Sequence, residues 1–212
     1  MAFTLGPRAK AAGYRLAAFD SIGSTNAEAL SRAREGERGP MWFVTSEQTA
    51  GRGRRHRPWI APRGNLACSI LEIIDVSPAV AATLGFAAGL ALEAALQRVG
   101  MEASARSAGS DDMKFSLKWP NDVLAGQQKL AGILLEAEAL PGERLAVVVG
   151  IGINVVEAPQ ATPTPATSLK AIGIDVGAEE LFAILSEMWT EFRDLWDRGH
   201  GFGEIRRRWL ER

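Results

Sequence analysis

Cysteine and histidine are scarce in this sequence. Cys68 is the one cysteine among 212 residues, and the histidines are His56 and His200. A single thiol cannot form an internal disulfide, and so few sulfur and imidazole groups exclude the paired-ligand patterns of zinc sites. Cys68 stands in a strand-like segment, where cysteine usually acts as a small buried hydrophobe, and no Ser-His-Asp set can be assembled. A bound metal would therefore be a hard cation held by oxygen atoms.

Long apolar runs and an excess of one charge are also missing. No stretch approaches the roughly 20 apolar residues that a membrane span needs. The N-terminal MAFTLGPRAKAAGYR is interrupted by Pro7, Arg8 and Lys10 before it reaches the length of a signal-peptide core. The formal net charge is -1, whereas nucleic-acid-binding domains usually carry a basic excess. We therefore expect a cytoplasmic protein that binds neither membranes nor nucleic acids.

The order of predicted strands and helices favours an α+β fold. Hydrophobic patterns and turn residues predict strands at 15–19, 41–45, 65–74, 115–119, 123–124, 130–138 and 145–155. The last of these is the most hydrophobic and is placed at the centre of the sheet. The predicted helices are 27–34, with a capping box from Thr25 to Glu28, then 79–99, 178–198 and 203–212, while 103–114 and 158–165 are predicted loops. Because strict alternation of strand and helix is absent, we expect a mixed or antiparallel central sheet flanked by helices.

The segment Ser46–Trp59 (SEQTAGRGRRHRPW) concentrates arginine around two glycines. It matches neither the GxGxxG nor the GxxxxGK[ST] phosphate-binding pattern. Arg52 and Arg54 can nevertheless bind phosphate or carboxylate through paired donors, and Gly51 and Gly53 let the backbone approach a ligand closely. A nucleotide phosphate, a nucleic-acid backbone and plain solvent all remain candidates for what this loop meets.

A second segment, KWPND at 118–122, joins a cation to amide and carboxylate oxygens. Lys118 and Trp119 end a predicted strand, and Asn121 and Asp122 follow Pro120 in a turn. Such a group can pair a lysine with an anionic substrate while the oxygens of Asn121 and Asp122 face Mg²⁺. A plain turn after an edge strand explains Pro-Asn-Asp equally well but leaves Lys118 beside Trp119 without a function.

Glycines also interrupt the most hydrophobic strand, in the segment GIGIN at 150–154. Glycine weakens a strand interior unless another backbone or a ligand comes close, so Asn154 would lie at the rim of the sheet beside a ligand. The alternative is a β-bulge.

Three segments resemble, in their order and in the identity of their residues, the catalytic domain of biotin protein ligases: SEQTAGRGRRHRPW, KWPNDVLAGQQKLAGILLE and VVVGIGINV. The upstream DSIGSTN at 20–26 looks like that family's substrate-contacting Ser-Thr-Asn element. The resemblance runs from about residue 15 to about residue 156. It implies the fold shared by biotin and lipoate ligases, with 1–14 as an N-terminal extension and 15–212 as the catalytic domain.

The resemblance implies the ATP-dependent, AMP-forming activity of a biotin-[acetyl-CoA-carboxylase] ligase. The carboxylate of biotin attacks the α-phosphate of ATP, which gives biotinoyl-5′-AMP and pyrophosphate. A lysine of a biotin carboxyl carrier protein then attacks the mixed anhydride and releases AMP. ATP, Mg²⁺ and the substrate biotin are implied, and no covalent enzyme intermediate is needed. The identity of the carrier and the formation of a homodimer stay open.

The resemblance also assigns roles to individual residues. The biotin-binding residues are Ser24, Thr25, Asn26, Gln48, Gly51, Arg52, Gly53, Arg54, Lys118 and Gly132. The residues for ATP and the adenylate are Arg54, Trp119, Asn121, Asp122, Lys129 and Asn154, of which Asp122 and Asn154 would also hold Mg²⁺. Lys118, Arg52 and Arg54 are the expected catalytic residues, because cations stabilise the negative charge that develops on phosphate oxygens. Trp119 would wall the nucleotide side, and the arginine segment would close over the adenylate and exclude water.

The sequence departs from the family's pattern at three places. His56 and Pro58 stand where glycine and another loop residue are common, which would alter how the loop retains the adenylate. Too few residues precede 15 for a helix-turn-helix domain, and we expect the family's small C-terminal SH3-like barrel to be absent. Three other functions therefore stay in view: a non-catalytic biotin or acyl-adenylate binding protein, a lipoate or octanoate ligase-like enzyme, and a nucleic-acid contact.

Overall fold

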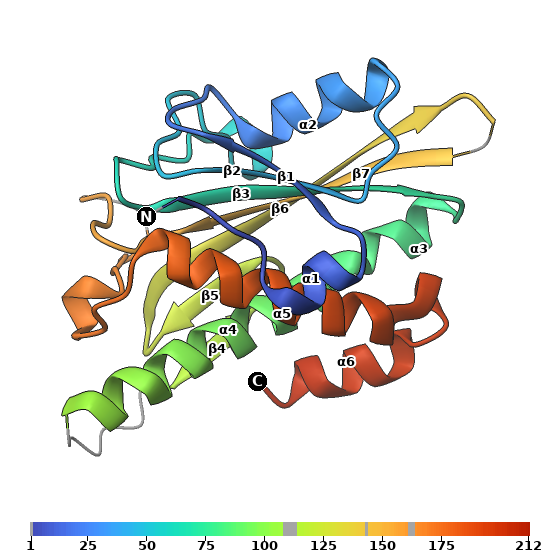
Figure 1. Ribbon diagram of the computed structural model, residues 1–212. Helices are drawn as coiled ribbons and strands as arrows, with labels where there is room; N and C mark the ends of the chain where they lie inside the picture. Colours follow the sequence, from blue (N-terminus) through green and yellow to red (C-terminus); the bar gives the residue numbers. More distant parts are fainter. Residues whose placement is uncertain (1, 108–113, 143, 161–163) are drawn as a thin grey trace.

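The computed structural model describes residues 2–107, 114–142, 144–160 and 164–212. Within these ranges seven strands form one sheet (Figure 1). The strands are β1 (Arg15–Phe19), β2 (Met41–Thr45), β3 (Leu66–Ile74), β4 (Phe115–Lys118), β5 (Asp122–Ala125), β6 (Gln128–Leu140) and β7 (Arg144–Ile153). The α-helices are α1 (Pro7–Ala11), α2 (Thr25–Arg34), α3 (Pro78–Ala82), α4 (Leu84–Ser107), α5 (Ala178–Trp196) and α6 (Phe202–Leu210). Short 3₁₀ helices are η1 (Arg54–His56), η2 (Lys170–Ile172) and η3 (Asp197–Gly199).

The sheet is mixed, as the sequence predicts. Its strand order is β1-β2-β3-β7-β6-β5-β4. β1 and β2 run parallel, and every other neighbouring pair runs antiparallel. β7 lies in the middle of this order between β3 and β6, which confirms the central position predicted for the most hydrophobic segment.

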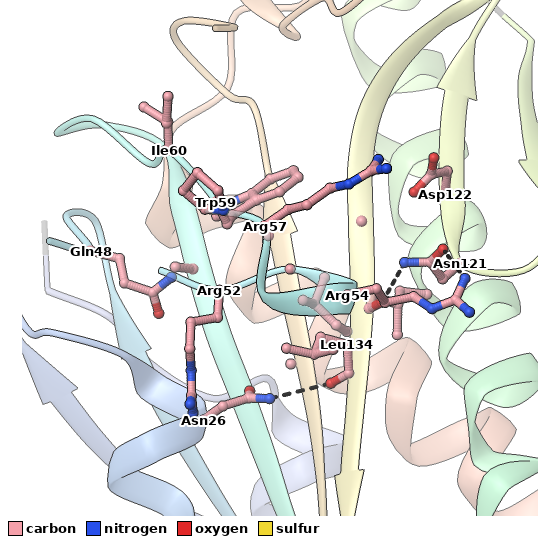
Figure 2. A pocket seen from close by; sticks show the side chains of 18 of the residues that line it. Asn26, Gln48, Arg52, Arg54, Arg57, Trp59, Ile60, Asn121, Asp122 and Leu134 are labelled. Atoms are coloured by element: carbon pink, nitrogen blue, oxygen red, sulfur yellow. Dashed lines mark hydrogen bonds between the residues drawn. The ribbon is translucent and has the colours of Figure 1, made fainter. Parts of the chain in front are cut away.

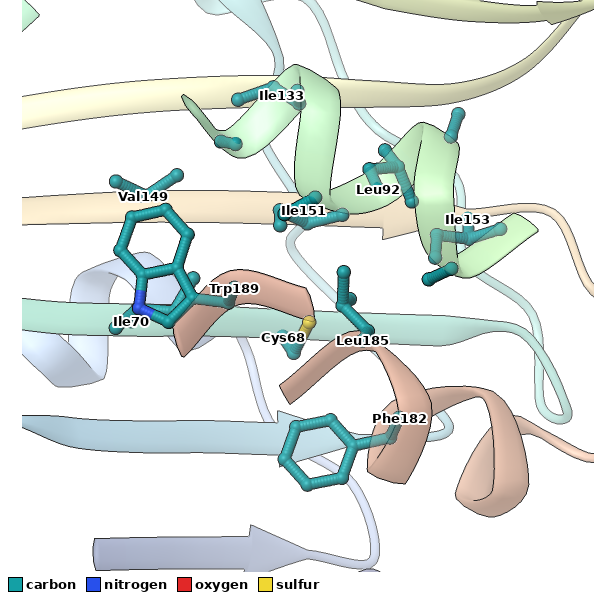
Figure 3. Close-up of a cluster of buried hydrophobic side chains, with 14 of the residues drawn as sticks. Cys68, Ile70, Leu92, Ile133, Val149, Ile151, Ile153, Phe182, Leu185 and Trp189 are labelled. Atoms are coloured by element: carbon teal, nitrogen blue, oxygen red, sulfur yellow. The ribbon is translucent and has the colours of Figure 1, made fainter. Parts of the chain in front are cut away.

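The two faces of the sheet are covered unequally. Helices α1, α4, α5 and α6 lie on one side of the sheet in Figure 1, and α2 lies on the other. Successive side chains of a strand point to opposite faces, so Val147, Val149 and Ile151 of β7 join the large core beneath α4 and α5 (Figure 3). Ala146 and Val148 point the other way and join a small apolar cluster under α2. Beyond α2, that second face is free to form a cavity.

The long predicted helix at 79–99 is two helices. Thr83 separates α3 from α4, and its Oγ1 donates to Val80 O (2.6 Å) while accepting a hydrogen bond from Trp196 Nε1 (2.7 Å). A contact from α5 therefore sets the break, and periodicity could not reveal it. α4 continues to Ser107, so the first part of the predicted loop 103–114 is helical instead; residues 108–113 lie outside the described ranges.

The cap of α2 also differs from the prediction. Ser24, rather than Thr25, is the N-cap, and its Oγ accepts a hydrogen bond from Ala27 N (3.3 Å). The predicted capping box between Thr25 and Glu28 is therefore wrong. Thr25 is released from capping and becomes available for other contacts.

One helical segment contradicts the expectation about apolar length. Within the described residues, 78–106 is long and apolar enough to cross a membrane by length and composition, although 61% of its most apolar window is buried inside the protein. The burial follows from its packing against the sheet and α5, as in the core helix of a soluble protein.

The N-terminal segment packs against α5 rather than standing apart. Gly6 N donates to Ser186 Oγ (2.9 Å), and Leu5, Ala9 and Tyr14 are buried in the large core. Residues 5–14 therefore contribute to the fold, while the predicted boundary at residue 15 stays a prediction.

Candidate active site

A cavity of about 430 Å³ lies on the α2 face of the sheet. The strands β6 and β7 form its floor, and the segment 51–60, here called the arginine loop, covers it (Figure 2). The predicted site residues that line it are Ser24, Thr25, Asn26, Gln48, Arg52, Gly53, Arg54, Asn121, Asp122, Lys129, Gly132 and Asn154. The structure thus brings together segments that are more than 100 residues apart in the sequence.

Glycines in the floor make room for side chains that enter the cavity. A Cβ atom on Gly150 would lie 2.2 Å from Asn26 Oδ1, and one on Gly152 would lie 2.4 Å from the ring of Trp59. The register of β7 with β3 and β6 is continuous through both glycines. The alternative of a β-bulge is therefore wrong, and the predicted close approach is made by side chains.

One end of the cavity carries neutral hydrogen-bonding groups. Gln48 Oε1 accepts hydrogen bonds from Thr25 N (2.9 Å) and Thr25 Oγ1 (3.2 Å). Asn26 Nδ2 donates to Leu134 O (3.3 Å), and Ser69 Oγ lies 2.6 Å from Asn26 Oδ1 and 2.7 Å from Thr25 Oγ1. The network fixes a set of donors and acceptors for an uncharged polar ligand group.

Ser69 belongs to this network, although the sequence did not lead us to select it. It is fully buried on β3 and supports both Thr25 and Asn26. The available signal was a serine in a mostly apolar strand, since a buried hydroxyl needs a partner.

The arginine loop brings cations over the floor. In Figure 2, the side chains of Arg52, Arg54 and Arg57 extend from the loop across the cavity. Arg54 Nη1 donates to Asn121 Oδ1 (3.3 Å). The loop is closed by its own backbone, because Gly53 N donates to Arg57 O (2.7 Å). Arg55 and Arg57 line the cavity too, although only Arg52 and Arg54 were predicted as site residues.

The opposite end of the cavity holds a lysine and a carboxylate. Lys129 Nζ lies 2.6 Å from Asp122 Oδ1 and 5.5 Å from the ring centroid of Trp59. Trp59, from the arginine loop, thereby covers this end and packs over Gly152. The prediction assigned it no role, although it ends the quoted arginine segment.

Asn154 lines the cavity and carries a buried side-chain oxygen. Its Nδ2 donates to Thr167 O (3.0 Å), while its Oδ1 has no hydrogen-bond partner among the residues that the structure describes. A buried acceptor without a partner is costly unless a ligand or ion satisfies it. With the Asp122 carboxylate on the same cavity, the oxygen donors fit a hard cation, which commonly binds one or two protein oxygens together with phosphates.

Three predicted residues lie outside the cavity lining: Gly51, Lys118 and Trp119. Gly51, the first residue of the arginine loop, is buried, and an added Cβ would lie 2.4 Å from Trp59 O. Trp119 is 65% exposed and packs against Phe86 (5.5 Å between ring centroids) and α6. Trp119 therefore packs against aromatic partners on the helical side, while Trp59 lines the cavity. The predicted role of Trp119 as a wall for the nucleotide stays a prediction.

Lys118 ends β4 beside the cavity. Its side chain is exposed, and in the sheet the residue pairs in register with Asp122, whose side chain lines the cavity. A flexible four-carbon stem thus starts one strand away from the lining. The predicted role of Lys118 in catalysis stays a prediction.

Comparison with known proteins points to one family. The Biotin/lipoate A/B protein ligase family matches residues 18–154. A biotin--[acetyl-CoA-carboxylase] ligase of Paracoccus denitrificans is 39% identical over 89% of this chain and 77% of its own length. A Mycobacterium tuberculosis protein of the same name is also 39% identical, over 72% of this chain, and the match spans about half (53%) of that relative.

A solved structure has the same fold. The biotin protein ligase of Aquifex aeolicus, in complex with biotin and ATP, superposes with a TM-score of 0.70 at 28% sequence identity. The match covers 92% of this chain and 76% of the Aquifex chain. The fold expected from the sequence is therefore confirmed.

Proposed function

The chain belongs to the biotin/lipoate A/B protein ligase family, and on that basis we propose that it is a biotin--[acetyl-CoA-carboxylase] ligase. It joins the carboxylate of biotin to the α-phosphate of ATP, which gives biotinoyl-5′-AMP and pyrophosphate. It then transfers the biotinoyl group to a lysine of a biotin carboxyl carrier protein and releases AMP. The reaction takes place in the cytoplasm, and neither membranes nor nucleic acids take part.

The layout of the cavity is the main support for this activity. Neutral donors and acceptors from Thr25, Asn26 and Gln48 lie at one end, which Arg52 also reaches (Figure 2). The cations of Arg54, Arg57 and Lys129 lie over the rest. The uncharged ureido ring of biotin suits the first end. Its carboxylate and the phosphates of ATP suit the second, where fixed positive charge stabilises the charge that builds up during displacement at phosphorus.

Two features of the chain assist the chemistry. The cavity holds the carboxylate and the α-phosphate in contact, which removes much of the entropic cost of a reaction between two molecules. The arginine loop, with Trp59 packed over Gly152, covers the reacting atoms and keeps water from the anhydride. Lys118 reaches in from the end of β4 when the carboxylate and phosphate are bound.

Mg²⁺ accompanies ATP in this proposal. Asp122 and Asn154 Oδ1 would hold it, since both residues line the cavity and the Asn154 oxygen has no partner within the described part of the chain. A bound Mg²⁺ would neutralise phosphate charge. The release of Asp122 from Lys129 would then free that lysine for the nucleotide.

The decisive experiment incubates the protein with biotin and MgATP. We expect native mass spectrometry to detect bound biotinoyl-AMP, and biotin to be required for exchange of labelled pyrophosphate into ATP. Labelled biotin should then appear on the lysine of a carrier domain. Adenylate formation without transfer would support the biotin-sequestering alternative instead, and an equal calorimetric affinity for lipoate would contradict specificity for biotin.

A further inference from the structure

Glu136 lies just beyond the floor of the cavity and contacts two separate parts of the site. Its Oε2 accepts a hydrogen bond from Asn26 Nδ2 (2.7 Å), and its Oε1 lies 3.7 Å from Arg52 Nη2. The side chain is 29% exposed. It ends the KLAGILLE segment quoted above, and neither the sequence nor the proposed reaction gives it a role.

The contact with Asn26 fixes which way that amide faces. An ionised carboxylate can only accept hydrogen bonds, as can the Leu134 carbonyl that Asn26 Nδ2 also reaches (3.3 Å). Both require the NH₂ group of Asn26 on their side. The oxygen Oδ1 therefore turns toward Ser69 and the cavity.

The contact with Arg52 is of a different kind. The Arg52 side chain is 44% exposed and the separation is 3.7 Å, so the pair is screened by water and is weak. A weak pair suits a loop that must close and open in each cycle, because an anion arriving in the cavity can take over the guanidinium at little cost. Glu136 thus gives the arginine loop a partner before any ligand is present.

We propose that Glu136 is a positioning residue that couples the Ser-Thr-Asn element to the arginine loop. It orients the Asn26 amide toward the ligand and holds Arg52 over the empty cavity until an anionic ligand replaces it. The nature of that ligand rests on the proposed function, whereas the coupling is a property of the free protein.

The chain contains a matched control for this idea. Glu138 lies two residues further along β6 on the same face, and it also pairs with an arginine, Arg34 of α2, at 2.6 Å. That pair is distant from the arginine loop in sequence and lines no part of the cavity. Glu138→Gln therefore removes the same charge from the same strand without touching the coupling.

The test measures hydrogen exchange in the protein without ligand. Gln at position 136 can still accept a hydrogen bond from Asn26 but no longer attracts Arg52. We expect the amides of Gly53 and Trp59, which bond within the loop to Arg57 O and Gly51 O, to exchange about two- to fivefold faster in Glu136→Gln, the range expected for an exposed ion pair. In Glu138→Gln their exchange should equal that of the wild type.

A double-mutant cycle separates coupling from a general structural effect. If Glu136 acts through Arg52, Glu136→Gln should change loop exchange no further in an Arg52→Gln background. The melting temperatures of all variants should stay alike, because an exposed ion pair contributes little to global stability. Equal exchange in Glu136→Gln and wild type, or equal acceleration by Glu138→Gln, would overturn the proposal.

The experiment still decides the proposal if a variant does not fold or if the protein lacks the proposed activity. If Glu136→Gln does not fold, Arg52→Gln breaks the same pair from its more exposed side, and unchanged loop exchange in that variant also overturns the coupling. If the wild type shows no biotin-dependent pyrophosphate exchange, the proposed function fails, while the exchange data on the free protein still decide the coupling.

Discussion

Lys118 and Lys129 differ in how the fold holds them. Lys129 is fixed by Asp122 and lies over Trp59, whereas Lys118 is exposed at the end of β4 and is not among the residues that line the cavity. An exposed, flexible lysine contributes little to stability. Lys118 would then stabilise only the transition state of the reaction, in which negative charge develops on the α-phosphate.

Replacing Lys118 tests that assignment. We expect Lys118→Ala to lower biotin-dependent ATP–pyrophosphate exchange by roughly 100-fold, the usual effect of removing one preorganised charge donor, with an unchanged melting temperature. Lys170→Ala is the control, because Lys170 is also exposed and lies outside the cavity. Exchange near the wild-type rate in Lys118→Ala would show that this lysine is not catalytic.

A second residue, Glu72, is buried on the opposite face of the sheet. It is 4% exposed, its Oε1 accepts a hydrogen bond from Tyr14 Oη (2.6 Å), and its Oε2 lies 3.4 Å from Arg193 Nη2. Trp189 Nε1 donates to the same Tyr14 hydroxyl (2.9 Å). Burial outweighs these partners and raises the pKa of the Glu72 carboxyl above its ordinary value of 4.5.

The raised pKa predicts how stability depends on pH. The folded protein binds the Glu72 proton more tightly than the unfolded chain, so this contribution is fully present below pH 4.5 and is lost as pH rises through the folded pKa. The free energy of unfolding of the wild type should therefore fall relative to Glu72→Gln as pH rises above 4.5. Urea denaturation at a series of pH values measures this difference, and a relative gain of the wild type with pH would refute it.

At the scale of single elements, the side chains of β7 alternate between the large core on one face and the floor of the cavity on the other. Its odd-numbered residues fill the large core, and its even-numbered glycines leave the cavity floor bare. A Cβ on Gly152 would lie 2.4 Å from Trp59, closer than atoms can approach. The strand therefore determines where the arginine loop can rest.

Gly152→Ala should consequently displace Trp59 and the loop. We expect weaker binding of biotinoyl-AMP, by about tenfold or more if displacement costs about 1.4 kcal/mol, and faster hydrogen exchange in the loop. Gly85→Ala, in α4, has open space around the added methyl group and should leave binding unchanged. Unaltered adenylate affinity in Gly152→Ala would mean that the loop does not need Trp59 in its present place.

The sequence was sufficient to predict the strands, because alternation, β-branched runs and turn residues are local signals. It did not predict the break at Thr83 or the full length of α4, which depend on contacts with other elements. The same limit applies to the site. Motifs identified Thr25, Asn26 and Arg52, but only the folded sheet shows that Ser69 contacts the first two and that Glu136 contacts the last two.

For the whole molecule, positive and negative charges nearly cancel, but they are unevenly distributed over the structure. The net charge is -1, yet Arg52, Arg54, Arg57 and Lys129 share one cavity. Such a concentration of cations attracts anions and is weakened by salt, since the Debye length is about 8 Å at physiological ionic strength.

Salt should therefore affect the two substrates differently. ATP carries several negative charges and biotin carries one, so raising the NaCl concentration should increase the KM for ATP more than the KM for biotin. Initial rates of pyrophosphate exchange at fixed free Mg²⁺ measure both constants. Equal increases would indicate that the cavity's cations do not contact the triphosphate.

The unequal covering of the sheet has a consequence for redesign. The tightly packed tryptophans and leucines of the large core lie with α4 and α5, whereas the cavity lies on the face that carries α2. Smaller side chains at Leu134 and Ile60, which line the cavity, would make room for a bulkier acid without changing a residue of the large core. Most variants altered at these positions should therefore still fold, so that a library can be screened directly for the use of new acyl donors.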